Sequence, residues 1–333
     1  MKVIDIHSHF IPECYIASIA RAGNVYGETI TVENGRKVIT VRSGMKYILV
    51  DELYRLESII KEMDDAGIDL AVLSPPPTIF HYNLPADEAK GHAEMLNNGM
   101  AEAVATNTAR FLGMAYVPLQ NGELAAAELE RCVKELGIKA VHICTNVEGK
   151  NLDDEEFLPF FARAEALQAL ILVHPWNVAG MDRMRRYHLS NAIGNPMDTA
   201  IAVGSLIFGG VLDRYPDLRI CFSHAGGAAP FIAGRMDRAY RIRPECRGLT
   251  RQAPSEYLKM IYFDTIAHWQ PALKYLVDVA GCEQVLLGSD FPFQLFDMGD
   301  PDPLATVKQL PDLTEECREK ILGRNAARLL GLA

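Results

Sequence analysis

Eight short apolar segments recur along the 333-residue chain, and stretches with helical periodicity separate most of them. Their hydrophobic residues are nearly continuous and do not alternate with polar ones, which is typical of parallel strands covered on both faces. The segments are 3–10, 69–75, 111–119, 139–145, 169–175, 218–226, 260–266 and 284–292. Eight such strand–helix units predict an α/β fold in the form of a (β/α)₈ TIM barrel.

The helical stretches carry apolar residues three and four positions apart, which places them on one face of a helix. Examples are 53–67, 124–137 and 157–169. Gly67 and Gly137 end two of them, where glycine commonly terminates a helix. Although 333 residues exceed most single domains, barrels use this length in one unit, so we expect a single domain over 1–333.

Three segments depart from this alternation. Residues 20–50 hold two β-rich runs around Asn34-Gly35, which predicts a small hairpin insertion after the first strand, near the barrel mouth. Residues 176–200 form a long connection that we expect to shape a site. The amphipathic tail at 312–333 predicts a helix packed on the outside of the barrel.

Composition excludes several classes of function. The net charge of −10 argues against nucleic-acid binding, which needs clustered Lys and Arg. The chain has no apolar run long enough for a membrane span, and its start lacks the pattern of a signal peptide. Seven scattered cysteines without a C-x-x-C pair predict reduced thiols in a cytoplasmic protein.

Five polar residues stand at the carboxyl ends of predicted strands, where barrels of this class build their sites. They are His7, His9, His174, His224 and Asp290. Side chains two positions apart on a strand point the same way, so His7 and His9 can meet one ion. Imidazoles and a carboxylate suit a borderline divalent ion such as zinc in an open site.

The pattern also indicates chemistry. A divalent ion lowers the pKa of bound water and polarises a substrate oxygen. His224 can exchange a proton near neutral pH, and Asp290 can act as ligand and also as acid or base. A single histidine at a strand end is often only a packing residue. The five together favour a metal site, because buried polar groups need partners.

The chain resembles the amidohydrolase superfamily, in the branch of the 2-amino-3-carboxymuconate-6-semialdehyde decarboxylases. The resemblance covers essentially the whole chain. Its motifs are HSHFIP, IKEMDDAGI, ERCVKELG, VHPW, GGVLDRYPDLRICFSHAGGAAPFIAGRMDRAY and LLGSDFPF.

This resemblance implies one zinc ion (manganese in some relatives) with the ligands His7, His9, His174 and Asp290, and a proton-transfer role for His224. Binuclear relatives use a carboxylated lysine at the end of strand four. Here that strand ends in Cys144-Thr145-Asn146, and Lys139 lies at its beginning. We therefore expect one divalent ion and no organic cofactor.

The resemblance also suggests residues that bind substrate. Arg235 corresponds to an arginine that reaches across a dimer interface to the substrate carboxylate, with a surface salt bridge as the alternative. His268 corresponds to a histidine at the site wall. Trp176, Phe291 and Phe80 would form apolar walls.

Other positions depart from the decarboxylase pattern. Tyr47 stands where the family has a second carboxylate-binding arginine, with Arg42 nearby but out of register, and Asn191 replaces a tryptophan. Ala225 replaces the glycine after the strand-six histidine. Because tyrosine cannot make the bidentate contact of arginine with a carboxylate, the substrate is expected to differ from that of the decarboxylase.

The remaining histidines receive weaker interpretations. His142 lies inside strand four, where it can point into the barrel. His81, His92 and His188 are expected in loops or at the surface.

The leading hypothesis is a metal-dependent decarboxylase of a small carboxylated aromatic or muconate-like acid, with Asp290 or His224 delivering the proton. The alternative is a hydrolase or hydratase that acts on a C–N, C–O, C–C or C=C bond with the same ion. A non-catalytic barrel is disfavoured, because such a protein is expected to lose one of the five residues. We expect a homodimer or higher homo-oligomer, a small carboxylated substrate, and no nucleic-acid or membrane partner.

Overall fold

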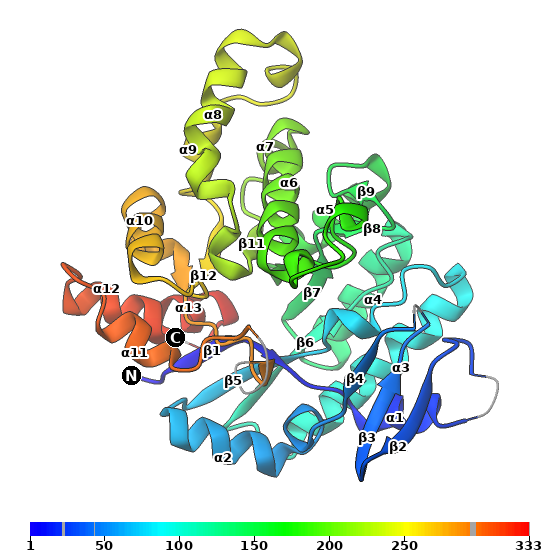
Figure 1. The fold of residues 1–333 in the computed structure, drawn as a ribbon. Coiled ribbons are helices and arrows are strands. Elements are labelled where there is room, and N and C mark those ends of the chain that lie inside the picture. Colours follow the sequence, from blue (N-terminus) through cyan, green and yellow to red (C-terminus); the bar gives the residue numbers. More distant parts are fainter. Residues whose placement is uncertain (22–23, 43, 294–297, 333) are drawn as a thin grey trace.

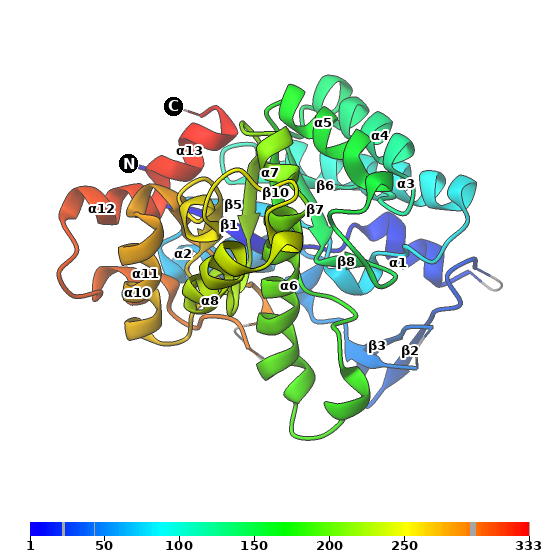
Figure 2. The ribbon, with the colours of Figure 1, turned by 90° about the horizontal axis from the view of Figure 1, so that it is seen from above.

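Eight parallel strands form a barrel at the centre of the molecule (Figures 1 and 2). The computed structural model describes residues 1–21, 24–42, 44–293 and 298–332. In sheet order the strands are β1 (Ile4–His9), β5 (Leu70–Ser74), β6 (Phe111–Tyr116), β7 (Ala140–Cys144), β10 (Leu170–His174), β11 (Arg219–Phe222), β12 (Tyr262–Asp264) and β13 (Val285–Leu286). The Ile6 amide donates to the Leu287 carbonyl oxygen (3.0 Å) and so brings β1 against the segment after β13. The predicted barrel is confirmed.

Helices surround the strands, as Figure 2 shows. They are α1 (Glu13–Ile19), α2 (Leu56–Ala66), α3 (Ala86–Ala105), α4 (Gly122–Glu135), α5 (Leu158–Ala166), α6 (Asn195–Phe208), α7 (Val211–Arg214), α8 (Ala229–Ile242), α9 (Pro254–Tyr257), α10 (Gln270–Ala280), α11 (Pro303–Lys308), α12 (Glu315–Glu319) and α13 (Asn325–Leu330). Gly67 ends α2 with a φ of 72°, the left-handed conformation that favours glycine. Within the described residues, no helix is both long and apolar enough to span a membrane.

The hydrophobic core has two parts. The larger lies between the strands and the helices, where Phe222 and Phe263 are fully buried among residues such as Leu206 and Leu273. The smaller fills the inside of the barrel with residues such as Ile6 and Leu172. The continuous apolar strands follow from this arrangement, because both faces of each strand are buried.

The C-terminal helix lies elsewhere than expected. Ala326, Leu329 and Leu330 of α13 belong to the same buried cluster as Ile4 and Leu170, which fill the barrel interior. This helix therefore covers the end of the barrel opposite the carboxyl ends of the strands. Ile321 and Leu322, earlier in the same tail, pack in the larger core outside the strands, so the expectation that the tail packs on the outside of the barrel is wrong for α13 only. Residue 333 of the predicted tail lies outside the described part of the chain.

A bulge in β1 sets the direction of the HxH side chains. The pairing with β5 runs from Asp5 opposite Ala71 to Ser8 opposite Leu73, so β1 has one extra residue at this point. Strict alternation would turn Ile6 and His7 to opposite sides of the sheet. Because of the bulge, two consecutive residues can both serve the inside of the barrel. Ile6 packs in the inner core, and His7 joins the group of site residues at the carboxyl ends of the strands.

A separate antiparallel sheet lies between β1 and α2 in the sequence. It consists of β2 (Thr29–Glu33), β3 (Arg36–Thr40) and β4 (Lys46–Ile48), and the turn between β2 and β3 is Asn34-Gly35. In Figure 1 this sheet stands beside α1. Ile39 is buried in the same core as Tyr15 of α1, which attaches the sheet to the barrel. Residues 22–23 and 43 of the predicted insertion lie outside the described ranges.

The predicted loop at 176–200 is shorter in the structure. A short 3₁₀ turn covers Met181–Arg183, and a π-helical turn at Ser190–Gly194 leads directly into α6, which begins at Asn195. Pro196 occupies the first turn of α6, a position that suits proline because no hydrogen bond from its nitrogen is needed there. The expectation that residues 195–200 belong to a loop is therefore wrong.

Cys282 and Cys317 form a disulfide. The expectation of seven reduced thiols is therefore wrong for this pair, while Cys14, Cys132, Cys144, Cys221 and Cys246 are free. A separation of 35 residues gave no sequence signal. Only the packing of α12 beside the turn that precedes β13 brings the two sulfurs together.

We predict five free thiols in the denatured, unreduced protein, measured with a thiol-reactive dye. The C282S variant should then show six, because Cys317 loses its partner. Reduction should lower the free energy of unfolding by up to about 4 kcal/mol, the effect of opening a loop of this length. Seven thiols in the unreduced wild type would contradict the disulfide.

Candidate metal centre

Four side chains from three parts of the barrel meet at the carboxyl ends of its strands. His7 and His9 come from β1, His174 from the last position of β10, and Asp290 from the segment after β13. One potential ligand atom from each lies within 4.8 Å of the others, and all four residues are buried. The structure thus brings together the ligand set proposed from the sequence.

Each of the three imidazoles in this group has an outer hydrogen-bond partner on Nδ1. The pairs are His7 with Asp264 Oδ2 (2.8 Å), His9 with Ser74 Oγ (3.3 Å) and His174 with the Pro175 carbonyl oxygen (2.9 Å). Outer partners of this kind select the tautomer that leaves Nε2 free to bind a metal. All three rings are therefore arranged to direct Nε2 toward one point.

The donor atoms fit a divalent ion. His7 Nε2 is buried and finds no hydrogen-bond partner in the described part of the chain, and Asp290 Oδ1 lies 3.4 Å from it. A buried nitrogen left unpaired is costly, and an ion at this point would remove the cost. Three nitrogens and one carboxylate oxygen form the ligand set of an open zinc-type site.

The electrostatics keep the Asp290 carboxylate charged and favour neutral rings at His174 and His9. At His7, burial alone would lower the pKa, but the nearby Asp290 and Asp264 outweigh it and raise this pKa in the absence of an ion. Burial by itself would raise the pKa of Asp290, but His7, His224 and His9 outweigh it and hold this pKa well below its ordinary value. Burial and the neighbouring His224 lower the pKa of His174 well below its ordinary value. Burial likewise lowers the pKa of His9. Neutral imidazole and ionised carboxylate are the forms that bind a metal.

His224 lies next to this group. Its Nε2 is 3.5 Å from Asp290 Oδ2, and its ring centre is 4.8 Å from that of His174. The backbone is left-handed at His224 (φ 54°), Ala225 (φ 55°) and Asp290 (φ 59°). This conformation costs on the order of 1–3 kcal/mol per residue and is concentrated at functional sites, where the surroundings hold it in place. His224 is thus positioned to exchange a proton beside Asp290.

Two buried carboxylates that the sequence analysis did not single out support the site. Asp5 accepts hydrogen bonds from the hydroxyls of Ser8 (2.7 Å) and Ser289 (2.6 Å), which joins β1 to the segment carrying Asp290. Asp264 accepts from His7 Nδ1. A signal was present, because each is a carboxylate inside an otherwise apolar strand, where a buried charge needs partners.

Gly288 is required by close packing at this point. A Cβ atom on this residue would lie 3.0 Å from the Cβ atoms of both Asp264 and His7. Such contacts are tighter than most real Cβ contacts, and both neighbours are buried. The glycine allows the end of β13 to approach the metal ligand from the side.

A cavity of about 500 Å³ opens onto the centre, and His224 and Asp290 lie in its wall. Among the residues proposed to bind substrate, Asn191 and His268 also line it. Phe231, Trp269 and Tyr275 add apolar surface, which is the usual character of a small-molecule site.

The other proposed substrate residues are not in the wall of this cavity. Phe80 is buried against His142, with ring centres 4.9 Å apart, and Phe291 is buried beside Asp290. Trp176 and Tyr47 are half-buried, and Arg235 is exposed on α8. Arg42 is exposed as well. Substrate contacts by these residues stay predictions.

His142 lies inside the barrel wall, close to the centre. Its ring centre is 5.7 Å from that of His9 and 5.6 Å from that of His174, and its Nδ1 contacts the Pro75 carbonyl oxygen at 3.1 Å. Burial is the main cause that lowers its pKa well below the ordinary value. It therefore presents a neutral ring beside two proposed ligands.

Two histidines expected in loops or at the surface are buried. His92 is in α3 and is 2% exposed, and His81 is 7% exposed. His81 Nε2 lies 3.1 Å from the Tyr15 hydroxyl, which also donates to Glu28. Burial raises the pKa of Glu28 to about 7. The surface expectation fails because Tyr15 of α1 and Tyr26, in the segment before β2, pack against these rings. His188, in contrast, is exposed.

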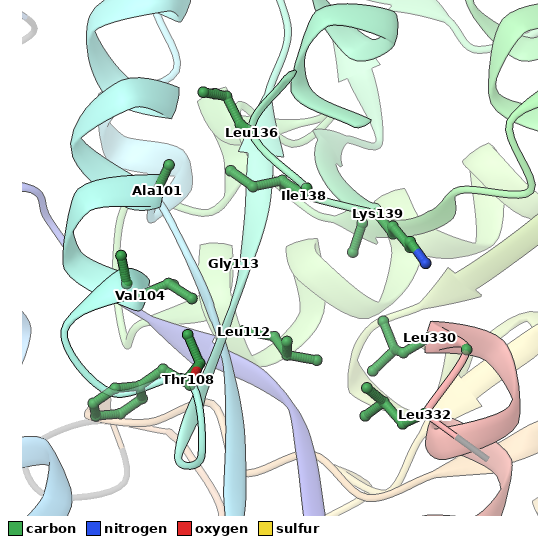
Figure 3. A pocket seen from close by; sticks show the side chains of 15 residues that line it. Ala101, Val104, Thr108, Leu112, Gly113, Leu136, Ile138, Lys139, Leu330 and Leu332 are labelled. Carbon is green, nitrogen blue, oxygen red and sulfur yellow. The ribbon is translucent and has the colours of Figure 1, made fainter. Parts of the chain in front are cut away.

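Lys139 lies at the opposite end of the barrel. It precedes β7 and lines a separate cavity of about 310 Å³ with Leu136 and Leu330 (Figure 3). The carboxyl end of β7, where binuclear relatives have a carboxylated lysine, is formed here by Cys144 and Thr145. This placement agrees with a site for one ion.

The chain belongs to the amidohydrolase family, whose model matches residues 4–332. It is 35% identical to the 2-amino-3-carboxymuconate-6-semialdehyde decarboxylase of Dictyostelium discoideum, over 99% of this chain and 91% of that protein. It superposes on the apo form of Metarhizium anisopliae IDCase with a TM-score of 0.87 and 25% identity, covering 99% and 97% of the two chains. A dihydroxybenzoic acid decarboxylase of Polaromonas, solved with bound manganese, gives a TM-score of 0.80 at 24% identity and covers 99% and 97%. The predicted superfamily is confirmed.

We predict that H174A lowers metal content from about one divalent ion per chain to well below half, because the site loses one of four ligands. The measurement is elemental analysis after dialysis against a metal-free buffer. H268A is the matched control, since His268 lines the cavity but is not among the four clustered residues. Equal metal content in H174A and wild type would contradict the ligand assignment.

Proposed function

We propose that the protein is a metal-dependent decarboxylase of a small carboxylated aromatic or unsaturated acid that needs no organic cofactor. The observation that carries this proposal is the group of three buried imidazoles and one carboxylate, with His224 beside it at a cavity of about 500 Å³. The decarboxylases among the relatives support the reaction class. We further propose a single-domain, cytoplasmic enzyme.

The proposed ion is zinc, with manganese as the alternative. Three imidazoles and one carboxylate match the preferences of zinc, whereas the Polaromonas relative was solved with manganese. When bound by His7, His9, His174 and Asp290, the ion would polarise a carboxylate or hydroxyl oxygen of the substrate.

The protein residues handle the proton. In a decarboxylation the bond between the substrate carbon and its carboxylate breaks, and its electron pair remains on that carbon while CO₂ leaves. A proton must then reach the same carbon. His224 Nε2 and Asp290 Oδ2 lie 3.5 Å apart at the cavity wall. His224 can therefore deliver the proton directly, and the ionised Asp290 can deliver it after accepting it from His224.

The cavity favours a substrate with one carboxylate. Among the described residues that line it there is no Lys or Arg, and binding a second carboxylate requires a cation or several donors. The aromatic side chains Phe231 and Trp269 suit a planar apolar ring. A second carboxylate would need either several of the neutral donors in the wall, such as Asn191 and His268, or a cation from elsewhere, such as Arg235 of another copy.

We also propose a homodimer through α6 and α8. Large apolar side chains are exposed there, including Phe231 (82%) on α8, and Met197 (48%) and Ile201 (41%) on α6. Exposed apolar surface of this kind usually marks an interaction site. Arg235 lies one turn after Phe231 on α8, so dimerisation would bring it near the cavity mouth of the partner copy.

The reaction class is tested by measuring CO₂ release from a panel of hydroxybenzoates and muconate-type acids with the metal-loaded protein. A decarboxylase releases CO₂ and consumes no water. A hydrolase or hydratase would instead add water to the substrate without releasing CO₂, which would contradict the proposal.

We predict that H224A lowers kcat by at least about 100-fold, the usual contribution of a proton-transferring side chain. The variant should keep about one metal ion per chain, because His224 lies outside the group of four ligands. Both quantities are measured on the same preparation. A parallel loss of metal would instead place His224 among the ligands.

A second prediction concerns Arg235. R235A should raise KM for a carboxylated substrate, and mixing it with an inactive H224A variant should restore activity in mixed dimers. The rescue occurs because one of the two sites then combines an intact His224 with Arg235 from the other copy. Absence of rescue in verified mixed dimers would argue against a role across the interface.

A further inference from the structure

Asp264 contacts both functional parts of the proposed site. It is the last residue of β12 and is fully buried. Its Oδ2 accepts from His7 Nδ1 (2.8 Å) and from the His224 amide (3.0 Å). Its Oδ1 accepts from the amides of Ala225 (2.8 Å) and Ile266 (3.0 Å). One carboxylate thus receives four donors.

The contact with His7 decides which ring nitrogen faces the site. A carboxylate can only accept a hydrogen bond, so His7 must carry a proton on Nδ1. In the neutral ring, Nε2 then has a free lone pair at the point where His9, His174 and Asp290 converge. Among the described residues this nitrogen has no hydrogen-bond partner. Asp264 therefore prepares His7 for metal binding.

The contacts with the two amides hold the turn that carries His224. His224 and Ala225 both have left-handed backbones, which non-glycine residues rarely adopt. Their N–H groups point to the two oxygens of Asp264, so the carboxylate stabilises this conformation. The same turn places His224 Nε2 beside Asp290.

We propose that Asp264 is a positioning residue that couples the two functions, orienting a metal ligand and the proton carrier through one buried carboxylate. This inference rests on the proposed function. Asp5 shows the contrast, because it is equally buried but accepts from backbone and hydroxyl donors and from no imidazole ring.

The substitution D264N tests the coupling. An asparagine has nearly the same size, and its oxygen can still accept from Ala225 and Ile266. Its NH₂ group, however, would face the Nδ1 proton of His7 and the backbone N–H of His224. All three groups are hydrogen-bond donors, so neither hydrogen bond could form. His7 can relieve this conflict by moving its proton to Nε2, where it blocks the metal.

We expect D264N to bind Zn²⁺ about 10- to 100-fold more weakly than wild type, the range for loss of an outer-shell partner. The measurement is a titration of metal-stripped protein in competition with a chelator. At saturating Zn²⁺, kcat should still fall at least tenfold because the His224 turn is no longer held. A purely structural role would lower only the melting temperature.

D198N is the matched control. Asp198 is also buried and accepts from Thr145, from Asn146 Nδ2 (3.0 Å) and from the Ala179 amide (2.9 Å), but it contacts no proposed ligand. It should lose stability while its Zn²⁺ affinity stays within about twofold of wild type. D264N with the affinity and kcat of wild type would overturn the inference.

A measurement on the wild type covers the case in which D264N does not fold. In the zinc-loaded protein labelled with ¹⁵N-histidine, NMR should detect His7 with a proton on Nδ1 and none on Nε2. A proton on Nε2 would overturn the inference. If the wild-type protein binds neither Zn²⁺ nor Mn²⁺ in the titration, the proposed function fails instead, so the two failures are distinguishable.

Discussion

The site depends on how a buried negative charge is compensated. Asp290 is almost fully enclosed, and such a carboxylate is stable only if positive charge or hydrogen-bond donors surround it. Here the rings of His7, His9 and His224 supply them. The same requirement explains the outer carboxylate Asp264. Each imidazole that faces inward needs an acceptor behind it, and the barrel wall provides one.

The barrel is what makes this compensation possible. Parallel strands end at one rim, so His9 and Asp290 meet although they are 281 positions apart. His9 Nε2 lies 2.9 Å from Asp290 Oδ1. The bulge in β1 and the left-handed residues after β11 adjust the directions of individual side chains by local backbone changes. Below the rim the strands are regular and apolar. The stability of this packed core compensates for the conformational strain of the irregular rim.

Much of the fold could be read from the sequence, because hydrophobic periodicity is local. The apolar segments and the helices at 53–67 and 124–137 depend on neighbours only a few residues away. The ligand candidates were also accessible, since His7-x-His9 and Asp290 stand at strand ends. Other features could not be predicted from the sequence, for a physical reason. The Cys282–Cys317 pair, the burial of His81 and His92, and the support from Asp264 arise between segments far apart in the chain.

The sequence by itself therefore determined the alternation of strands and helices, the chemical types of the candidate ligands and their place at one rim. Tertiary structure decided which proposed substrate residues meet the cavity, with Asn191 and His268 in its wall and Phe80 packed behind His142. It also decided that the C-terminal helix covers the base of the barrel. The sequence directly gives residue types and their spacing. The direction of a side chain instead depends on packing against elements that are distant in the sequence.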